Sequence, residues 1–256
     1  MAGSWDGAAL DIRLLVDHRE DLVAARTADQ QRLRWHLHDL WPELEIPAGA
    51  LDTGKWLGKA SRRLARAEQT TRVRVARELV RQISARTTRI RELEAELAAL
   101  VESYAPQPLA ERGCGPLTAA KLIGEIAGAD RFSSDAKLAR TSGTAPIPAS
   151  TGQTNRHRLD RGGNRQLNCA LHRLAVNKAR YCPDTAAYLA RKQAEGKTRK
   201  EALRSLKRYL ARRVWRLLRS PVTSKPVPVE AAVPARPKAV ETVAIEAAPY
   251  LMPCLR

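Results

Sequence analysis

The sequence predicts a mainly α-helical protein in which long, coiled-coil-like helices precede a compact, basic helical domain. Apolar residues recur at threes and fours over two long stretches, 9–41 and 71–104, as they do along one face of an α-helix. Only one Phe and five Tyr occur among 256 residues, so a core must consist mainly of Leu, Ala, Val and Ile. Such cores are typical of small helical bundles.

The first part of the chain is expected to form three helices. Leu recurs at helical spacing over 9–41, and Pro42 ends the pattern because proline cannot continue a helix. A loop with Pro47 and two glycines follows, and a shorter helix is expected over 56–67. The third helix should cover 71–104 and end before Pro106.

The stretch 71–104 carries an extended apolar stripe. Its members lie between charged residues: Val73, Val80, Ile83, Ile90, Leu93, Leu97 and Leu100. About four heptads of this kind fit a coiled-coil arm, and they also fit an ordinary bundle helix. Because an exposed stripe of this composition would face water, we expect the arm to join chains into a homo-oligomer, a dimer or a tetramer.

From Gly113 the composition changes, and a compact helical domain is expected up to Leu218. Its predicted helices are 117–126, 134–140, 161–180, 184–195 and 199–218. After Ser220 the chain is rich in Pro, Ala and Val without a period, which predicts a disordered tail. The predicted organisation is therefore a helical linker and coiled-coil arm (1–110), a DNA-binding and catalytic domain (111–219) and the tail (220–256).

The charge of the chain is strongly positive and unevenly distributed. Lys and Arg number 45 against 27 acidic residues, which gives a net charge of +18. The segment 156–219 alone holds 19 Lys and Arg against four acidic residues, a net charge of +15. A cationic surface that only maintains solubility is the alternative, but this concentration favours a binding face for a polyanion, DNA or structured RNA.

Other classes of site and location have little support in the sequence. The four cysteines show neither C-x-x-C pairing nor a nearby His at zinc-finger spacing, so we expect reduced, structural cysteines and no metal ligands. No run of 18 apolar residues and no signal-peptide pattern occurs, so we expect no membrane partner. A cytoplasmic protein bound to DNA is the resulting expectation.

A glycine-rich turn at 113–118 is the first candidate contact with nucleic acid. Gly113 and Gly115 precede a helix start, and Thr118 lies in its first turn. Backbone N–H groups at such a turn, together with the helix dipole, can bind a phosphate. The turn resembles that of helix-hairpin-helix DNA-binding modules, although the same residues also occur in plain turns.

A hydroxyl-rich loop at 141–153 is the second candidate. It contains Ser150 and Thr151, and it precedes a run of basic residues: Arg156, Arg158, Arg161 and Arg165. If a phosphodiester lay across these guanidinium groups, either hydroxyl would be placed to attack it while the arginines stabilise the transition state. The alternative is a Ser/Thr loop without a catalytic role.

The order of these motifs resembles the C-terminal transposase domain of the insertion-sequence one-ten family. The motifs are Gly113-Cys114-Gly115-Pro116-Leu117-Thr118-Ala119, Asp130-Arg131-Phe132, Gly143-Thr144-Ala145-Pro146, Ser150-Thr151-Gly152 and Arg161-Gly162-Gly163-Asn164-Arg165-Gln166-Leu167. The upstream helices, with Leu14-Leu15-Val16-Asp17-His18-Arg19-Glu20-Asp21-Leu22 and Arg32-Leu33-Arg34-Trp35-His36-Leu37, are similar to the linker and coiled coil of that family. The resemblance covers about 10–218.

The resemblance implies a DNA recombinase with two half-sites. One half is a ribonuclease-H-like domain that holds Mg²⁺ on four acidic residues, and the other supplies a nucleophilic serine, as in serine-recombinase-like strand transfer. The family also uses a guide RNA of the element. No β-rich segment with spaced acids precedes Ala9, so we expect the metal-binding half to be missing here. The Ser-Gly pair of the family corresponds to Thr151-Gly152, with Ser150 one residue earlier.

These patterns predict DNA transposition by part of an insertion-sequence transposase, with Asn164 joining the nucleic-acid contacts. Two interpretations of its activity stay open. An enzyme would need Ser150 or Thr151 and a partner chain that supplies the metal site, whereas a catalytically inactive remnant would only bind DNA and RNA. An architectural helix-hairpin-helix protein that bends or bridges DNA is a third interpretation, and it needs no hydroxyl.

Overall fold

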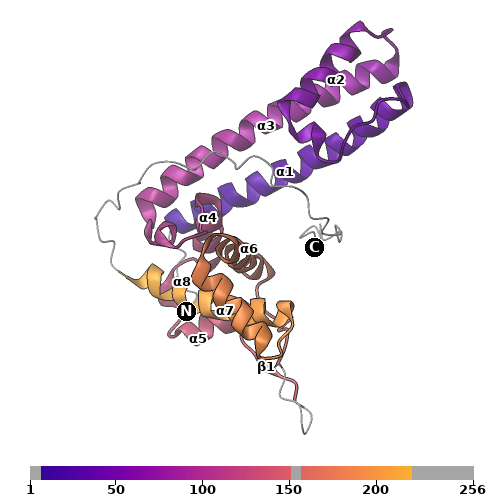
Figure 1. Ribbon diagram of the computed structural model, residues 1–256. Helices are drawn as coiled ribbons and strands as arrows, with labels where there is room; N and C mark the ends of the chain where they lie inside the picture. Colours follow the sequence, from indigo (N-terminus) through magenta and orange to yellow (C-terminus); the bar gives the residue numbers. More distant parts are fainter. Residues whose placement is uncertain (1–6, 151–156, 221–256) are drawn as a thin grey trace.

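In the computed structural model, residues 7–150 and 157–220 are described, and they form an elongated arm joined to a compact body (Figure 1). The arm holds α1 (Gly7–Leu40), α2 (Gly54–Arg66) and α3 (Thr71–Tyr104). The body holds α4 (Pro116–Ile126), α5 (Asp135–Thr141), α6 (Arg165–Tyr181), α7 (Pro183–Ala194) and α8 (Arg199–Arg219). Short 3₁₀ turns lie at Ala50–Asp52, Gln107–Ala110 and Ala129–Arg131. The mainly α-helical fold class is confirmed.

Helices α1 and α3 lie side by side along the arm, and α2 packs at its tip (Figure 1). The tip has a hydrophobic core of its own: Leu33, Leu37, Leu51, Ala60, Leu64, Val73, Ala76, Leu79, Val80 and Ile83. Closer to the body, the carboxylate of Asp29 on α1 is buried and pairs with Arg86 on α3. The pair Arg19–Glu94, at 2.5 Å, joins the same two helices. Both pairs fix the antiparallel register of α1 and α3.

The apolar stripe of α3 faces α1 of the same chain, which corrects the expectation that it faces water. Val73, Ile83, Ile90, Leu93 and Leu97 are each at most 4% exposed. The stripe is covered because α1, with 34 residues, is as long as α3 and pairs with it along the arm. A homo-oligomer stays a prediction, but this stripe is not the surface that would form it.

Helix α4 is the centre of the body. Each residue from Ala119 to Ile126 is buried, and the helix packs against α1, α3 and α6. Gly124 allows the close approach of α1, because a Cβ there would lie 2.9 Å from the Cα of Arg13. The main core joins residues of α1 and α3 to α4, α6 and α8. Packing therefore continues across residue 110, where two domains are expected to meet.

A buried ion cluster ties the arm to this central helix. The ammonium group of Lys121 on α4 lies 3.0 Å from both Asp17 and Glu20 of α1, and 3.6 Å from Glu125. Burial alone would lower the pKa of Lys121, but the hydrogen bonds to Asp17 and Glu20 outweigh it and raise the pKa. Glu125 in turn accepts a hydrogen bond of 2.7 Å from the Asn164 side chain, just before α6.

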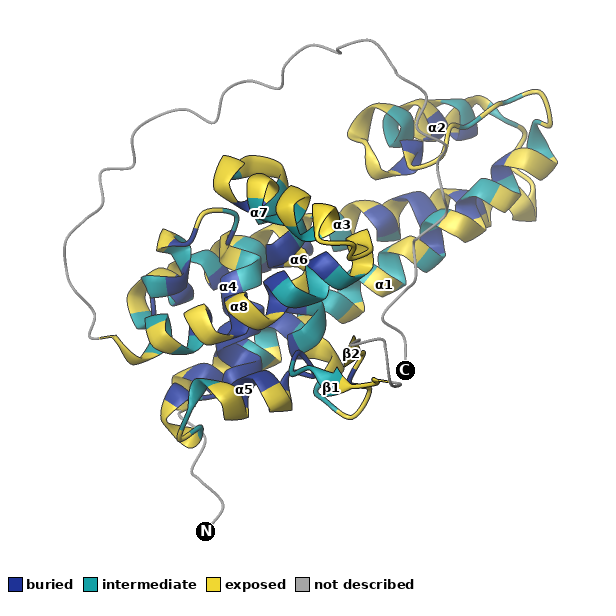
Figure 2. Cartoon of the chain, turned by 60° about the horizontal axis from the view of Figure 1, so that its bottom comes forward, coloured by how far each residue is buried: buried dark blue, intermediate teal, exposed yellow. Residues whose placement is uncertain are grey.

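The second layer of the body is formed by α8, which packs on α5, α6 and α7. Helix α7 buries only Thr185, and most of its surface is exposed (Figure 2). The expected helices agree with these elements to within a few residues, with one larger difference. Helix α6 begins at Arg165 and not at 161, because Gly162 and Gly163 precede its cap at Asn164.

The described residues bear on the expectations about membrane spans, metal sites, the cysteines and the tail. Among these residues, no helix combines the length and apolarity needed to cross a bilayer. No group of three His, Cys, Asp or Glu side chains in 7–150 and 157–220 is placed to hold a metal ion. The pKa of the Cys114 thiol is raised to about 12, mainly by burial and to a smaller extent by the negative charge of Glu111. Of the predicted disordered tail, only Ser220 is described.

Candidate nucleic-acid interface

A small hairpin projects from the body between α5 and α6 (Figure 1). Strand β1 (Ile147–Pro148) pairs antiparallel with β2 (His157–Arg158). Sequence periodicity did not reveal strands this short. The exposed Ser150 follows β1 by two residues, and 151–156 lie outside the described ranges. Of the hydroxyl-rich stretch 141–153, Thr141 therefore ends α5, 147–148 form β1, and Ser150 follows this strand.

The base of the hairpin, which we call the neck (141–145 and 160–164), is a crossing of two backbone segments. A Cβ on Gly163 would lie 2.2 Å from the backbone nitrogen of Gly143. Gly143 itself has a φ of +63°, in the left-handed region that glycine adopts without strain. The motifs Gly143-Thr144-Ala145-Pro146 and Arg161-Gly162-Gly163-Asn164 thus contain the two glycines that this crossing requires.

Hydrogen bonds close the neck. The backbone N–H of Asn164 donates to the Thr141 carbonyl at 2.6 Å, and the Asn168 side chain donates to the Ser142 carbonyl at 2.7 Å. The buried carboxylate of Asp160 pairs with Arg140 at 2.6 Å and accepts the N–H of Gly162 at 3.0 Å. The hairpin therefore leaves the body from a fixed base.

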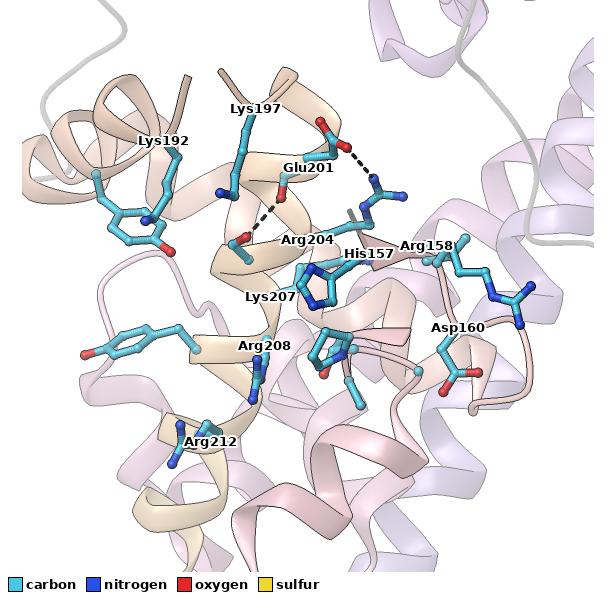
Figure 3. A pocket seen from close by; sticks show the side chains of 18 of the residues that line it. His157, Arg158, Asp160, Lys192, Lys197, Glu201, Arg204, Lys207, Arg208 and Arg212 are labelled. Carbon is cyan, nitrogen blue, oxygen red and sulfur yellow. Dashed lines mark hydrogen bonds and ion pairs between the residues drawn. The ribbon is translucent and has the colours of Figure 1, made fainter. Parts of the chain in front are cut away.

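A cleft of about 650 Å³ lies between this hairpin and helices α7 and α8 (Figure 3). His157 and Arg158 line it from β2, and Arg204, Lys207, Arg208 and Arg212 line it from α8 (Figure 3). With Lys192 and Lys197 the lining holds seven Lys and Arg, against Asp160, Glu195 and Glu201. The cleft is therefore a concentrated part of the basic segment found in the sequence.

The three acidic residues of the lining have cationic partners. Asp160 pairs with Arg140, Glu195 with Lys192 at 2.7 Å, and Glu201 with Arg204 at 3.8 Å. In contrast, Arg158 and Arg208 are exposed and form no ion pair within 7–150 and 157–220. Positive charge therefore remains uncompensated on both sides of the cleft.

Lys207 is the buried cation of the lining, with 7% of its surface exposed. Its ammonium group donates to the side-chain oxygen of Asn168 at 2.6 Å, and no carboxylate of the described residues pairs with it. Burial and then repulsion by Arg204 lower the pKa of Lys207. A buried ammonium with N–H groups to spare is stabilised by an anion that enters the cleft.

The predicted contact residues fall into three groups. Arg158 lines the cleft, and Arg161 lines an adjoining hollow with Arg158 and Arg204. Arg165 is exposed at the first residue of α6. Thr151 and Arg156 lie outside the described residues.

Asn164 has a structural role that the sequence did not indicate. Its side chain accepts the Leu167 N–H at 3.0 Å, which caps α6, and donates to Glu125 at 2.7 Å. Both functions of the amide are thereby used inside the fold. Contact between this side chain and nucleic acid stays a prediction.

The glycine turn before α4 also has a structural reason. Gly113 has a φ of +90°, and a Cβ there would lie 2.9 Å from the backbone nitrogen of Lys178 on α6. Beside it, the buried carboxylate of Glu111 pairs with Lys178 and, at 2.7 Å, with Arg213. Burial would raise the pKa of Glu111, but these two cations outweigh it and lower the pKa. Gly113 is thus needed for packing on α6.

The rest of the turn is open. A Cβ on Gly115 would meet nothing within 4 Å, and this residue is exposed before the first turn of α4. Thr118 is half-buried in that turn. Phosphate binding at Gly113, Gly115 and Thr118 stays a prediction, as does the helix-hairpin-helix comparison.

The α8 residues of the cleft were not among the contacts predicted from the sequence. Arg204, Arg208 and Arg212 are spaced by four, so an α-helix places them on one face. This spacing could have indicated a basic face on α8. The sequence could not indicate that the hairpin approaches this face, because the approach depends on the crossing at the neck.

The fold and the cleft define a basic helical protein with a concave cationic surface of the kind that suits a polyanion. Comparison with known proteins agrees with this class. Residues 111–190 match the model of the Transposase IS116/IS110/IS902 family. The resemblance to the insertion-sequence one-ten family is thereby confirmed. The matched segment includes the glycine turn, α4, the hairpin and its neck.

Two insertion-element proteins from Streptomyces are similar to the chain. The insertion element IS110 uncharacterized 43.6 kDa protein of Streptomyces coelicolor is 34% identical over 132 residues, which cover 50% of this chain and 33% of that protein. The insertion element IS116 uncharacterized 44.8 kDa protein of Streptomyces clavuligerus is 26% identical over 265 residues, which cover 85% of this chain and 65% of that protein. The matches thus span less than two thirds of either relative.

Proposed function

We propose that this chain takes part in DNA transposition and that the cleft binds the DNA backbone. The observation that carries the proposal is the uncompensated charge of the cleft: Arg158 on the hairpin faces a lining that includes Arg208 and the buried Lys207. The match of 111–190 to a transposase family supports DNA as the polyanion. Arginine binds phosphate oxygens in a bidentate manner, so Arg158 and Arg208 would grip a strand from two sides.

The hairpin supplies the hydroxyl groups for strand transfer in this proposal. Ser150 is exposed two residues beyond β1, and Thr151 follows it. The oxygen of one of them would bond to phosphorus while a phosphorus–oxygen bond of the DNA strand breaks, and the released DNA hydroxyl would take up the proton. Cleft arginines would stabilise the negative charge that develops on the phosphate.

Other parts of the reaction would come from outside the described residues. The family resemblance implies Mg²⁺ in a domain with spaced acidic residues, and the described residues hold no group suited to a metal ion. A guide RNA and further copies of the chain belong to the same proposal as partners.

Binding can be tested by neutralising the two unpaired arginines. We expect Arg158→Gln/Arg208→Gln to weaken binding to a 30-base-pair duplex and to make the log–log salt slope shallower by about 2, because each phosphate contact contributes roughly 0.9. Arg81→Gln/Arg89→Gln is the matched control, since it removes two arm cations that pair with Glu78 and Glu92. Wild-type binding with a slope shallower than about −3 would contradict a multi-phosphate face.

The nucleophile can be tested by covalent capture. The chain is incubated with Mg²⁺, DNA that carries the ends of the element and its RNA, with and without a protein that supplies the acidic domain. We expect a DNA-linked protein band on a denaturing gel only when that domain is present. Loss of the band in Ser150→Ala alone, or in Thr151→Ala alone, identifies the attacking hydroxyl. If strand exchange survives both substitutions, neither hydroxyl is the nucleophile, and a binding-only, architectural role remains for the hairpin of this chain.

A further inference from the structure

A second basic surface lies at the arm tip, at the opposite end of the molecule from the cleft (Figure 1). Helix α2 contains five Lys and Arg and no acidic residue. Four of them, Lys55, Lys59, Arg62 and Arg66, follow each other at spacings of four, three and four. An α-helix places residues at these spacings on one face, so we call this row the α2 stripe.

The α2 stripe is turned away from the core of the arm tip. Ala60 and Leu64 are the buried residues of α2 and pack against α1 and α3, whereas all four stripe cations are exposed. Within the described residues none of the four forms an ion pair, although Arg63 between them pairs with Glu43 at 2.5 Å. Lys59 lies 4.6 Å over the ring of Trp56, a cation–π contact that attracts its ammonium group without neutralising the charge.

Four uncompensated cations in a row repel each other, and their repulsion disfavours the folded arm unless an anion compensates it. From Lys55 to Arg66 the row is about 17 Å long, at 1.5 Å of rise per residue. The major groove of DNA is about 12 Å wide, so a row of this length reaches phosphates on both sides of it. On α3 the core of the arm tip ends at Ile83 and the main core begins at Leu97, about 21 Å further along the helix at the same rise.

We infer that the α2 stripe is a second contact with the phosphate backbone of duplex DNA, separate from the cleft. The choice of DNA as the polyanion rests on the proposed function, since the transposase family match supplies it. Because the arm tip and the cleft lie at opposite ends of the molecule, one chain can contact two separate stretches of duplex (Figure 1).

A charge-matched pair of triple variants tests the inference. Lys55→Gln/Arg62→Gln/Arg66→Gln removes three stripe cations, and Arg72→Gln/Arg81→Gln/Arg89→Gln removes three exposed arm cations that have carboxylate partners. Both variants lower the net charge by the same amount. We expect the stripe variant to make the log–log salt slope for a 30-base-pair DNA duplex shallower by about 2 to 3, and the control to leave it unchanged.

The cleft variant Arg158→Gln/Arg208→Gln distinguishes the two proposals. If the stripe acts independently of the cleft, the stripe variant makes the log–log salt slope shallower by the same amount in the wild-type and in the cleft-variant background. If the stripe variant binds like wild type, or only as weakly as its control, the inference is wrong while the cleft proposal stands. An effect on duplex RNA without an effect on duplex DNA would overturn the choice of DNA. If the wild-type chain binds no duplex at all, both proposals fail.

Discussion

The crossing at the neck predicts that position 163 tolerates no side chain. In Gly163→Ala the new Cβ would lie 2.2 Å from the nitrogen and 2.4 Å from the Cα of Gly143, and 2.9 Å from the carbonyl carbon of Ser142. Ordinary contacts of this kind begin at about 3.4 Å, so two backbone segments must separate by more than 1 Å. The hydrogen bond from the Asn164 N–H to the Thr141 carbonyl, at 2.6 Å, would then break.

We expect this substitution to cost about 3 kcal/mol or more, the upper part of the range for overpacking, because backbone and not a flexible side chain must move. For a chain of this size, that corresponds to a fall in Tm of about 6–12 °C. Gly162→Ala is the matched control, because its Cβ would lie 3.5 Å from the Asp160 side chain, an ordinary contact. The control should change stability by less than about 0.5 kcal/mol.

Circular dichroism at 222 nm measures Tm for both variants, and hydrogen exchange of the Asn164 amide detects an opening confined to the neck. Wild-type exchange protection at Asn164 in Gly163→Ala, together with a Tm within about 2 °C of Gly162→Ala, would refute the crossing as described. A fall in Tm without faster exchange would locate the strain elsewhere.

Three further predictions follow from buried charges. Because its pKa is lowered, Lys207 should lose its proton before ordinary lysines as pH rises, so DNA affinity should fall at alkaline pH in wild type and stay level in Lys207→Arg. Lys121→Met leaves Glu20 and its neighbours without their shared cation and should cost about 3 kcal/mol in urea unfolding at neutral pH. Asp29→Ala should cost about 2 kcal/mol, because it leaves the partly exposed Arg86 without its carboxylate partner. The coupling is confirmed if adding Asp29→Ala to Arg86→Met causes no further loss of stability.

The helices were predictable because their signals are local. Thr71–Tyr104 was bounded correctly from apolar spacing and from the prolines that follow it. What covers the stripe of this helix was not predictable, since coverage by α1 and coverage by a second chain require the same apolar residues. Asp29 was a missed signal: a carboxylate on the packed face of α1 suits a partner on α3 of the same chain.

The candidate site was predictable only as a composition. The excess of cations in 156–219 is visible in the sequence, and Arg158 lies where a contact was expected. The selection of Lys207 and Arg208 depends on the neck, where residues 20 apart in the chain, Gly143 and Gly163, meet through backbone atoms. Asn164, a motif residue predicted to contact nucleic acid, also caps a helix, a role that the sequence alone did not indicate.

The ion cluster around Lys121 connects the arm to the base of the hairpin through side-chain contacts. Helix α1 runs without interruption from the tip of the arm to Asp17 and Glu20, whose carboxylates hold Lys121. Glu125, one turn further along α4, holds Asn164 at the neck. Side-chain contacts therefore run without a break from the arm to the base of the hairpin, from Asp17 and Glu20 through Lys121 and Glu125 to Asn164.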